Sequence, residues 1–376
     1  MDIDAPLPLL GGLSPSRFMQ RHWQRKPLLV RGALPGVQPP VARAGLFALA
    51  ADEGVESRLV EQGESGWKMR RGPFTRRALP PTARPGWTLL VQGLDLHVDA
   101  AHRLLQQFRF VPEARLDDLM VSYATEGGGV GPHFDSYDVF LLQVQGRRRW
   151  RYGKQKDLRL QEGVPLKILE HFEPEHDEVL EPGDMLYLPP RYAHDGIAEG
   201  ECQTCSIGFR APARAELARD LLQRLADEAG HEEGEGPVLY RDAGQPAVDA
   251  PGLIPPDLER FAAEALQRVL ADRDALPRTL GESLSEPKSN VWFEPGRQPR
   301  KGQGVALDRR TRMLYDARHV FVNGESWRAG GADAKLMRRL ADARRISAAD
   351  FARASEDARD LLASWCEAGW AHGEGT

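Results

Sequence analysis

A histidine and an aspartate stand one residue apart near the middle of the chain, where their side chains could bind a metal ion. His133 and Asp135 flank Phe134 in a segment with the character of a β-strand. Because alternate side chains of a strand point to the same face, the imidazole and the carboxylate project together while Phe134 turns into packing. Imidazole and carboxylate are two-thirds of the facial triad that holds non-haem Fe(II) and leaves positions open for substrate and oxygen. The pair therefore predicts a third ligand, a histidine distant in the sequence.

His194 is the candidate for the third ligand because of the segment that leads to it. Residues 182–184, Pro-Gly-Asp, are typical of a tight turn, and residues 185–188, Met-Leu-Tyr-Leu, suit a strand buried on both faces. A second turn follows, and His194 enters the next strand. A His-x-Asp pair alone arises by chance in many chains, whereas the pair together with this unit indicates a metal site. The alternative is that His133 caps a turn and His194 is a core histidine with its hydrogen bonds satisfied.

The sequence around these residues resembles a known enzyme family. The run from Gly127 to Trp150, GGGVGPHFDSYDVFLLQVQGRRRW, is similar to the bacterial ribosomal oxygenases, which belong to the JmjC branch of the cupin 2-oxoglutarate oxygenases. The likeness extends to residues 18–29, FMQRHWQRKPLL, and to residues 206–212, SIGFRAP. It covers the first 212 residues with specific motifs and the remainder in general layout.

The resemblance implies a protein hydroxylase that uses Fe(II), 2-oxoglutarate and O2. His133, Asp135 and His194 would hold the iron, and the substrate would be large-subunit ribosomal protein L-sixteen, hydroxylated on the β-carbon of an arginine. The resemblance also favours a homodimer. Two kinds of alternative stay open: an oxygenase acting on another ribosomal residue or on a small molecule, and a non-catalytic cupin or DNA-binding regulator.

The arginine run that follows the first two ligands predicts an anion-binding residue. Alternation along a strand places Arg148 on the face of Trp150 and Tyr152, which suits the barrel interior. The other face would point to solvent; it carries Arg147, Arg149 and Arg151. A buried guanidinium is costly unless it meets an anion, and it binds a carboxylate in a bidentate manner. In an oxygenase this anion would be the distal carboxylate of 2-oxoglutarate; the alternative is a structural ion pair.

The co-substrate pocket departs from the family pattern at one position. The family places a serine shortly before the triple glycine to help hold the co-substrate, and that place corresponds to Ala124 here. Ser122, on the same face of the strand, is a candidate to replace it. Thr204, expected opposite on the last barrel strand, is a second candidate. The pocket is therefore supported mainly by Arg148.

The elements that must position these residues indicate an α+β protein built on a double-stranded β-helix, the cupin or jelly-roll fold of JmjC enzymes. Between residues 118 and 211, short apolar strands alternate with Gly and Pro turns, which is typical of such a barrel. We expect residues 1–212 to form the catalytic domain with its N-terminal helices, 213–288 a helical dimerisation region, and 289–376 a winged-helix-like domain.

Two helices are expected after the barrel, one over residues 214–230 and, beyond a loop rich in Gly, Glu and Pro, a second from 257 to about 273. Each carries an apolar stripe at helical spacing, made by Leu217, Leu221, Leu222 and Leu225 in the first and by Phe261, Leu266 and Val269 in the second. Stripes of this kind outside a barrel favour dimerisation; the alternative is a bundle within one chain.

Composition and charge narrow the class of protein. The chain has 376 residues, of which 41% are hydrophobic and 28% charged, as in ordinary soluble globular proteins. It shows no apolar run long enough for a membrane span and no signal core at its start. Three cysteines favour a reducing compartment, so the cytoplasm is the expected location. A net charge of −5 argues against broad electrostatic binding to nucleic acid.

An acidic segment leads toward His194. Seven of the residues from Glu170 to Asp184 are acids, and they could attract a basic protein substrate if they overhang the mouth of the site. A solvated loop without such a role is the alternative.

Overall fold

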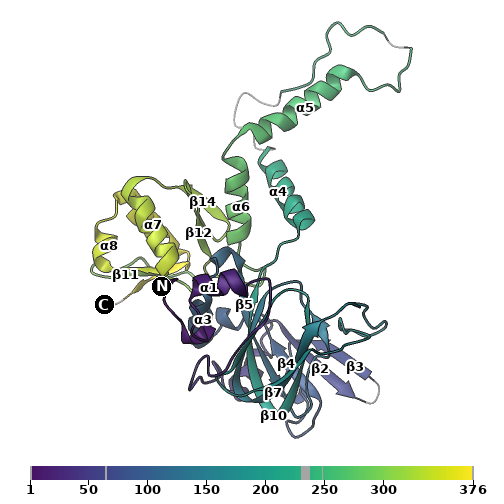
Figure 1. The fold of residues 1–376 in the computed structure, drawn as a ribbon. Coiled ribbons are helices and arrows are strands. Elements are labelled where there is room, and N and C mark those ends of the chain that lie inside the picture. Colours follow the sequence, from purple (N-terminus) through teal and green to yellow (C-terminus); the bar gives the residue numbers. More distant parts are fainter. Residues whose placement is uncertain (1, 64–65, 230–237, 248, 375–376) are drawn as a thin grey trace. The chain divides into compact units, whose positions relative to one another are not determined.

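The structure, a computed structural model, describes residues 2–63, 66–229, 238–247 and 249–374. The chain forms two compact units (Figure 1). The first comprises Met1–Ala211 with Asn290–Trp292, and the second Pro212–Ser289 with Phe293–Thr376. The three-domain division expected from the sequence stays a prediction.

One antiparallel sheet of ten strands organises the first unit. Its main path runs β1-β9-β7-β10-β5-β4-β2-β3, with β6 paired to β10 and β8 paired to β7. The strands are β1 Leu28–Val30, β2 Ser57–Gly63, β3 Gly66–Arg71, β4 Trp87–Val91, β5 Leu116–Ala124, β6 His133–Phe134, β7 Val139–Lys154, β8 His176–Leu180, β9 Met185–Leu188 and β10 Tyr192–Phe209. The two longest, β7 and β10, pair with each other and carry three of the six candidate site residues, Arg148, His194 and Thr204.

Strand β7 is continuous from Val139 to Lys154, and an irregularity in its middle reverses the alternation of its side chains. Before it, Phe140 and Leu142 face the large apolar core, and Leu141 faces the opposite side. After it, Trp150 and Tyr152 lie in the same cluster as Leu141. The register with β10 slips here, between Glu199 and Gln203, opposite Gly146 at φ +62°. This bulge shifts the alternation by one residue. After it, the even-numbered side chains lie on the face of the sheet opposite the large apolar core.

Short helices cover the face of the sheet that carries Phe140 and Leu142. Helix α1 (Pro15–Arg21) is capped by Ser14, whose Oγ accepts a hydrogen bond from the Arg17 N–H at 3.3 Å. Phe18 of α1 packs edge-on against Tyr187, with ring centroids 4.9 Å apart. The remaining helices of this unit are α2 (Arg43–Leu49), α3 (Asp99–Leu105) and the 3-10 turns Pro8–Leu10, Arg76–Ala78, Leu94–Leu96, Gln106–Phe108 and Glu113–Arg115. They bury the apolar face of the sheet and leave the other face for the site.

The second unit opens with three helices, α4 (Arg214–Ala229), α5 (Pro256–Ala271) and α6 (Ala275–Ser285). Helix α6 is not predicted by the sequence, because Pro277 and Gly281 are residues typical of loops. Gly281 is required by packing, since a Cβ there would lie 2.2 Å from the ring of Phe321. The helix is therefore held by its contact with the neighbouring sheet and not by the intrinsic propensity of its residues.

Two small sheets and three more helices complete the second unit (Figure 1). The sheets have the orders β15-β11-β16 and β12-β13-β14. The elements are β11 Gly304–Leu307, β12 Met313–Tyr315, β13 His319–Val322, β14 Glu325–Arg328, α7 Gly331–Ala343, β15 Arg345–Ile346, α8 Ala348–Ala352, α9 Glu356–Glu367 and β16 Ala371–Glu374. A hairpin turn at Asn323-Gly324 joins β13 to β14, with both residues at positive φ. Helix α7 begins after Gly330, and Asp333 lies in its first turn.

Across the part of the chain that the structure describes, no helix is both long and apolar enough to cross a membrane.

Candidate metal centre

The two histidines and the aspartate singled out in the sequence meet at one point. The register of β6 and β10 pairs His133 directly with His194, and their ring centroids lie 4.3 Å apart. The Nε2 atom of His194 is 3.7 Å from a carboxylate oxygen of Asp135. One potential ligand atom from each residue lies within 4.8 Å of the others, and this is the only such group found among the described residues. The arrangement leaves room for one metal ion.

Backbone carbonyls orient both imidazoles. The Nδ1 of His133 lies 2.8 Å from the Gly131 carbonyl oxygen, and the Nδ1 of His194 lies 3.0 Å from that of Tyr192. A carbonyl can only accept, so each Nδ1 carries the proton and each Nε2 keeps a free lone pair. This is the second hydrogen bond that metal-binding histidines usually make. The donor set, two neutral imidazoles and one carboxylate, fits Fe(II).

The surroundings keep His194 neutral. Burial, reinforced by the neighbouring His133, lowers the pKa of His194 to about 4, although Asp135 acts in the opposite direction. The ring is therefore unprotonated near pH 7, the form in which imidazole binds metals.

Tyr137 is a further residue next to the site that the sequence did not indicate. Loss of water around its hydroxyl, together with the charge of Asp135, raises the pKa of Tyr137. It stays a neutral phenol next to the carboxylate.

Trp150 packs over His194, with ring centroids 5.8 Å apart, and Gly196 makes room for it. Gly196 is the cross-strand partner of Trp150, and a Cβ there would lie 2.6 Å from the indole ring. Gly196→Ala is therefore expected to displace the indole, costing about 1–3 kcal/mol of stability and weakening metal binding. Thermal unfolding and metal titration would measure both effects. Gly208→Ala, whose added Cβ would meet only Asp118 Oδ1 at 3.6 Å, is the matched control on the same strand. Equal results for the two variants would contradict this packing role.

Arg148 points into the barrel, as the alternation of side chains predicted. It is 3% exposed, and its Nη1 donates to Ser122 Oγ at 2.6 Å. Its Nε and Nη2 are buried without a hydrogen-bond partner. The arginines of the opposite face are paired with acids instead: Arg147 with Glu199, Arg149 with Glu199 and Asp177, and Arg151 with Asp195. A buried guanidinium with two unused donors fits a carboxylate from outside the protein.

The two other candidates for the co-substrate pocket differ in their surroundings. Ser122 bonds to Arg148, so the structure brings these two together. Thr204 stands opposite Ser122 in the register, but its hydroxyl donates to Gln143 Oε1 at 2.7 Å. Gln143 is fixed in turn by Nε2 bonds to the carbonyls of Gln145 and Gly146. The hydroxyl of Thr204 is therefore used inside the protein.

Much of the charge of the acidic segment is paired. Glu178 and Asp184 both bind Arg31, at 2.7 and 2.8 Å, and Asp177 binds Arg149 at 2.8 Å. Paired carboxylates attract a basic substrate less strongly than free ones. The structure thus favours a structural role for these three acids.

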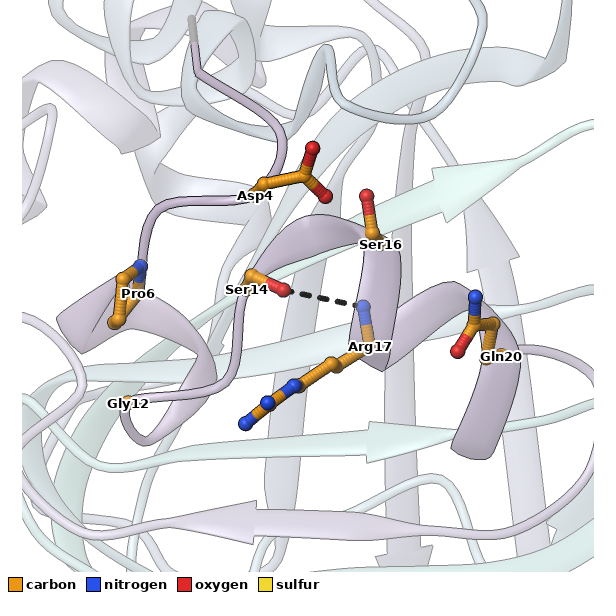
Figure 2. Close-up of a pocket in the computed structure, with 7 residues that line it drawn as sticks. All are labelled: Asp4, Pro6, Gly12, Ser14, Ser16, Arg17 and Gln20. Carbon is orange, nitrogen blue, oxygen red and sulfur yellow. Dashed lines mark hydrogen bonds between the residues drawn. The ribbon is translucent and has the colours of Figure 1, made fainter.

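A separate hollow of about 410 Å³ lies around the start of α1 (Figure 2). It is lined by Asp4, Pro6, Gly12, Ser14, Ser16, Arg17 and Gln20. Ser14 is occupied in capping the helix, and none of the three potential metal ligands contributes to the lining. The hollow is therefore distinct from the metal centre.

Comparison with known proteins agrees with this geometry. The JmjC domain family matches residues 103–217, which contain all three potential ligands, and the ROXA-like winged helix family matches residues 268–372. The ribosomal protein uL16 3-hydroxylase of Escherichia coli is 33% identical over 322 residues, covering 82% of this chain and 84% of the relative.

Solved structures of an E. coli ribosomal oxygenase are similar to this chain over nearly its whole length. The X-ray structure of E. coli ycfD superposes with a TM-score of 0.82 at 29% identity, covering 96% of this chain and 98% of that one. A structure of the ribosomal oxygenase YcfD in complex with cobalt and 2-oxoglutarate has a TM-score of 0.78 at the same identity and coverage. The predicted JmjC barrel and winged-helix-like region are confirmed. The chain belongs to the JmjC-type bacterial ribosomal oxygenases.

Proposed function

We propose that this chain is an Fe(II)- and 2-oxoglutarate-dependent hydroxylase of a ribosomal protein. The observation that carries the proposal is the pairing of two sites on one barrel face. Three ligand atoms within 4.8 Å of one another form the first, and the buried, partly unpaired guanidinium of Arg148 forms the second. A metal centre next to an internal carboxylate receptor is what a 2-oxo-dicarboxylate needs in order to bind by both ends.

Each residue then has a defined part. His133, Asp135 and His194 would hold the iron through their Nε2 and carboxylate oxygen atoms. Arg148 and Ser122 hold the distal carboxylate and so set the direction of the co-substrate. Trp150 keeps the ring of His194 in place and excludes water from that side. Iron, 2-oxoglutarate and O2, when bound, supply the oxidising chemistry that converts a C–H bond to C–OH.

The substrate assignment comes from the relatives. The E. coli relative is named a ribosomal protein uL16 3-hydroxylase, which supports that ribosomal protein as the substrate and a β-carbon as the site of hydroxylation. That the modified residue is an arginine is what the family resemblance implies. A ribosomal substrate also supports a cytoplasmic location. Mass spectrometry of ribosomal proteins from a strain lacking this chain tests the assignment: uL16 should be lighter by one oxygen, and the wild-type gene should restore it. An unchanged uL16 with another ribosomal protein altered would move the activity to that protein.

A binding protein without turnover is the competing function. It is separated by incubating the purified chain with Fe(II), O2 and 2-oxoglutarate and measuring succinate. Succinate formed above a control without iron indicates an enzyme. The nucleic-acid alternative finds little support in α7, because Arg338 donates to the Ala317 carbonyl at 2.9 Å and Arg339 pairs with Asp350 at 2.8 Å. The second unit therefore supports assembly better than DNA binding.

We further propose a homodimer held by the helices of the second unit. Leu225 of the first predicted stripe is buried within the chain, so that residue follows the alternative of intrachain packing. Leu222 on α4 and Leu266 and Leu270 on α5 are 63%, 69% and 64% exposed. Apolar side chains exposed to this degree on neighbouring turns are typical of a surface that a second protein chain covers.

The dimer predicts a mass of about twice 41.8 kDa in sedimentation or light scattering. Leu266→Glu combined with Leu270→Glu should shift the protein toward the monomer, because each would place a charge in the apolar contact. Gln267→Glu, on the same helix, is the control for added charge alone. A wild type that sediments as a monomer at micromolar concentration would refute the dimer.

A further inference from the structure

We propose that Thr88 is a further residue that binds the distal carboxylate of 2-oxoglutarate, an inference that rests on the proposed function. Thr88 lies on β4, next to the strand that carries Ala124 and Ser122. The Thr88 hydroxyl would supply the contact that a serine makes in the family and that Ala124, at that position here, cannot make.

The register of the sheet places Thr88 at that position. Thr88 is the direct cross-strand partner of Ala124, and its next inward neighbour Leu90 is the partner of Ser122. Trp87 and Leu89 belong to the apolar core on the opposite face. Because cross-strand partners share a face and alternate residues change face, Thr88 lies on the face of Ala124, Ser122 and the metal centre.

The hydroxyl of Thr88 has no use inside the protein. The residue is 1% exposed, and its Oγ1 is buried without a hydrogen-bond partner. The hydroxyl of Thr125 nearby contrasts with it, because that group lies 3.4 Å from the Trp87 carbonyl oxygen. Buried hydroxyls are normally paired, so an unpaired one points to a ligand absent from the structure.

One ligand group would use all of the unpaired hydrogen-bond donors near Thr88. Arg148 reaches the face through its bond to Ser122 and brings an Nε and an Nη2 without partners. Thr88 and Ser122 are diagonal neighbours across two strands, a relation that separates side chains by roughly 7–8 Å. A carboxylate with donors about 2.8 Å from its oxygens spans such a gap. One carboxylate would satisfy Thr88 Oγ1 and both free nitrogens of Arg148.

The role of Thr88 is tested by measuring how much the distal carboxylate, as distinct from the rest of the co-substrate, contributes to binding. Thr88→Val removes the hydroxyl and keeps the shape of the side chain. Calorimetric titration of the Mn(II)-loaded protein without oxygen compares 2-oxoglutarate with 2-oxopentanoate, whose methyl group replaces the distal carboxylate. The variant should bind 2-oxoglutarate about tenfold more weakly, as expected for a lost hydrogen bond to a charged group, and 2-oxopentanoate as the wild type does.

Two more variants keep the test decisive. Thr88→Ser retains the hydroxyl and should bind 2-oxoglutarate within about twofold of the wild type. Thr88→Val combined with Ala124→Ser places the hydroxyl on the neighbouring strand and should recover most of the lost affinity. Thermal unfolding of each variant reports whether it is folded.

The outcomes distinguish this inference from the proposed function. Unchanged 2-oxoglutarate affinity in Thr88→Val, or an equal loss for both ligands, would overturn the role of Thr88 and leave the proposed function intact. A wild type that binds no 2-oxoglutarate would remove both.

Discussion

His194→Ala is expected to abolish metal binding and 2-oxoglutarate turnover while leaving the protein folded. The variant removes one of the three proposed ligands, and the two that remain do not make up the facial triad that holds Fe(II). Even changes to residues that only hydrogen-bond a metal ligand cost about ten- to a hundredfold in affinity or activity. The loss for the ligand itself should therefore exceed about a hundredfold.

Metal-dependent stability measures this effect without turnover. A metal that binds only the folded state raises the unfolding temperature of the wild type, and this rise should vanish in His194→Ala. His133→Ala and Asp135→Ala should behave in the same way. His171→Ala, an exposed histidine in a loop, should keep both the metal-induced rise and the activity. A metal response of normal size in any of the three ligand variants would exclude the assigned centre.

The pairing of His133 with Asp135 on one face could be predicted because strand geometry is local. A His-x-Asp pair in any extended segment presents both side chains to one face, whatever the rest of the chain does. The same local rule placed Arg148 inward, since it was applied only to residues after Gly146. Applied from Phe140 onward it would have failed, because the bulge reverses the alternation between the two halves of β7.

What the sequence did not reveal depends on contacts between distant segments. Helix α6 contains a proline and a glycine, and only the ring of Phe321 shows why Gly281 is there. Leu225 and Leu222 are alike in pattern, yet one is buried within the chain and the other exposed. Thr88 carries no motif, and its unpaired hydroxyl is visible only once β4 is aligned with β5.

Arg148→Ala is expected to raise the 2-oxoglutarate concentration needed for half-maximal activity by at least about tenfold, with the metal still bound. A charge-assisted contact of this kind contributes about 1.5–3 kcal/mol, and each 1.4 kcal/mol corresponds to a factor of ten. Arg147→Ala and Arg149→Ala remove guanidinium groups from the outer face, where both pair with Glu199. These variants should change the co-substrate requirement little. Equal losses in all three would show that total charge, and not the inward position, governs binding.

Arg148→Met separates the binding role of this residue from any structural one. Without co-substrate, the guanidinium is buried with a single hydrogen bond to Ser122 and two unpaired donors. Replacing such a buried charge with an apolar side chain of similar length is often neutral or stabilising. The unfolding temperature of Arg148→Met without ligands should therefore equal or exceed that of the wild type, while 2-oxoglutarate should no longer raise it. A variant that is clearly less stable without ligands would instead show that Arg148 serves the folded structure itself, and the co-substrate would need another anchor.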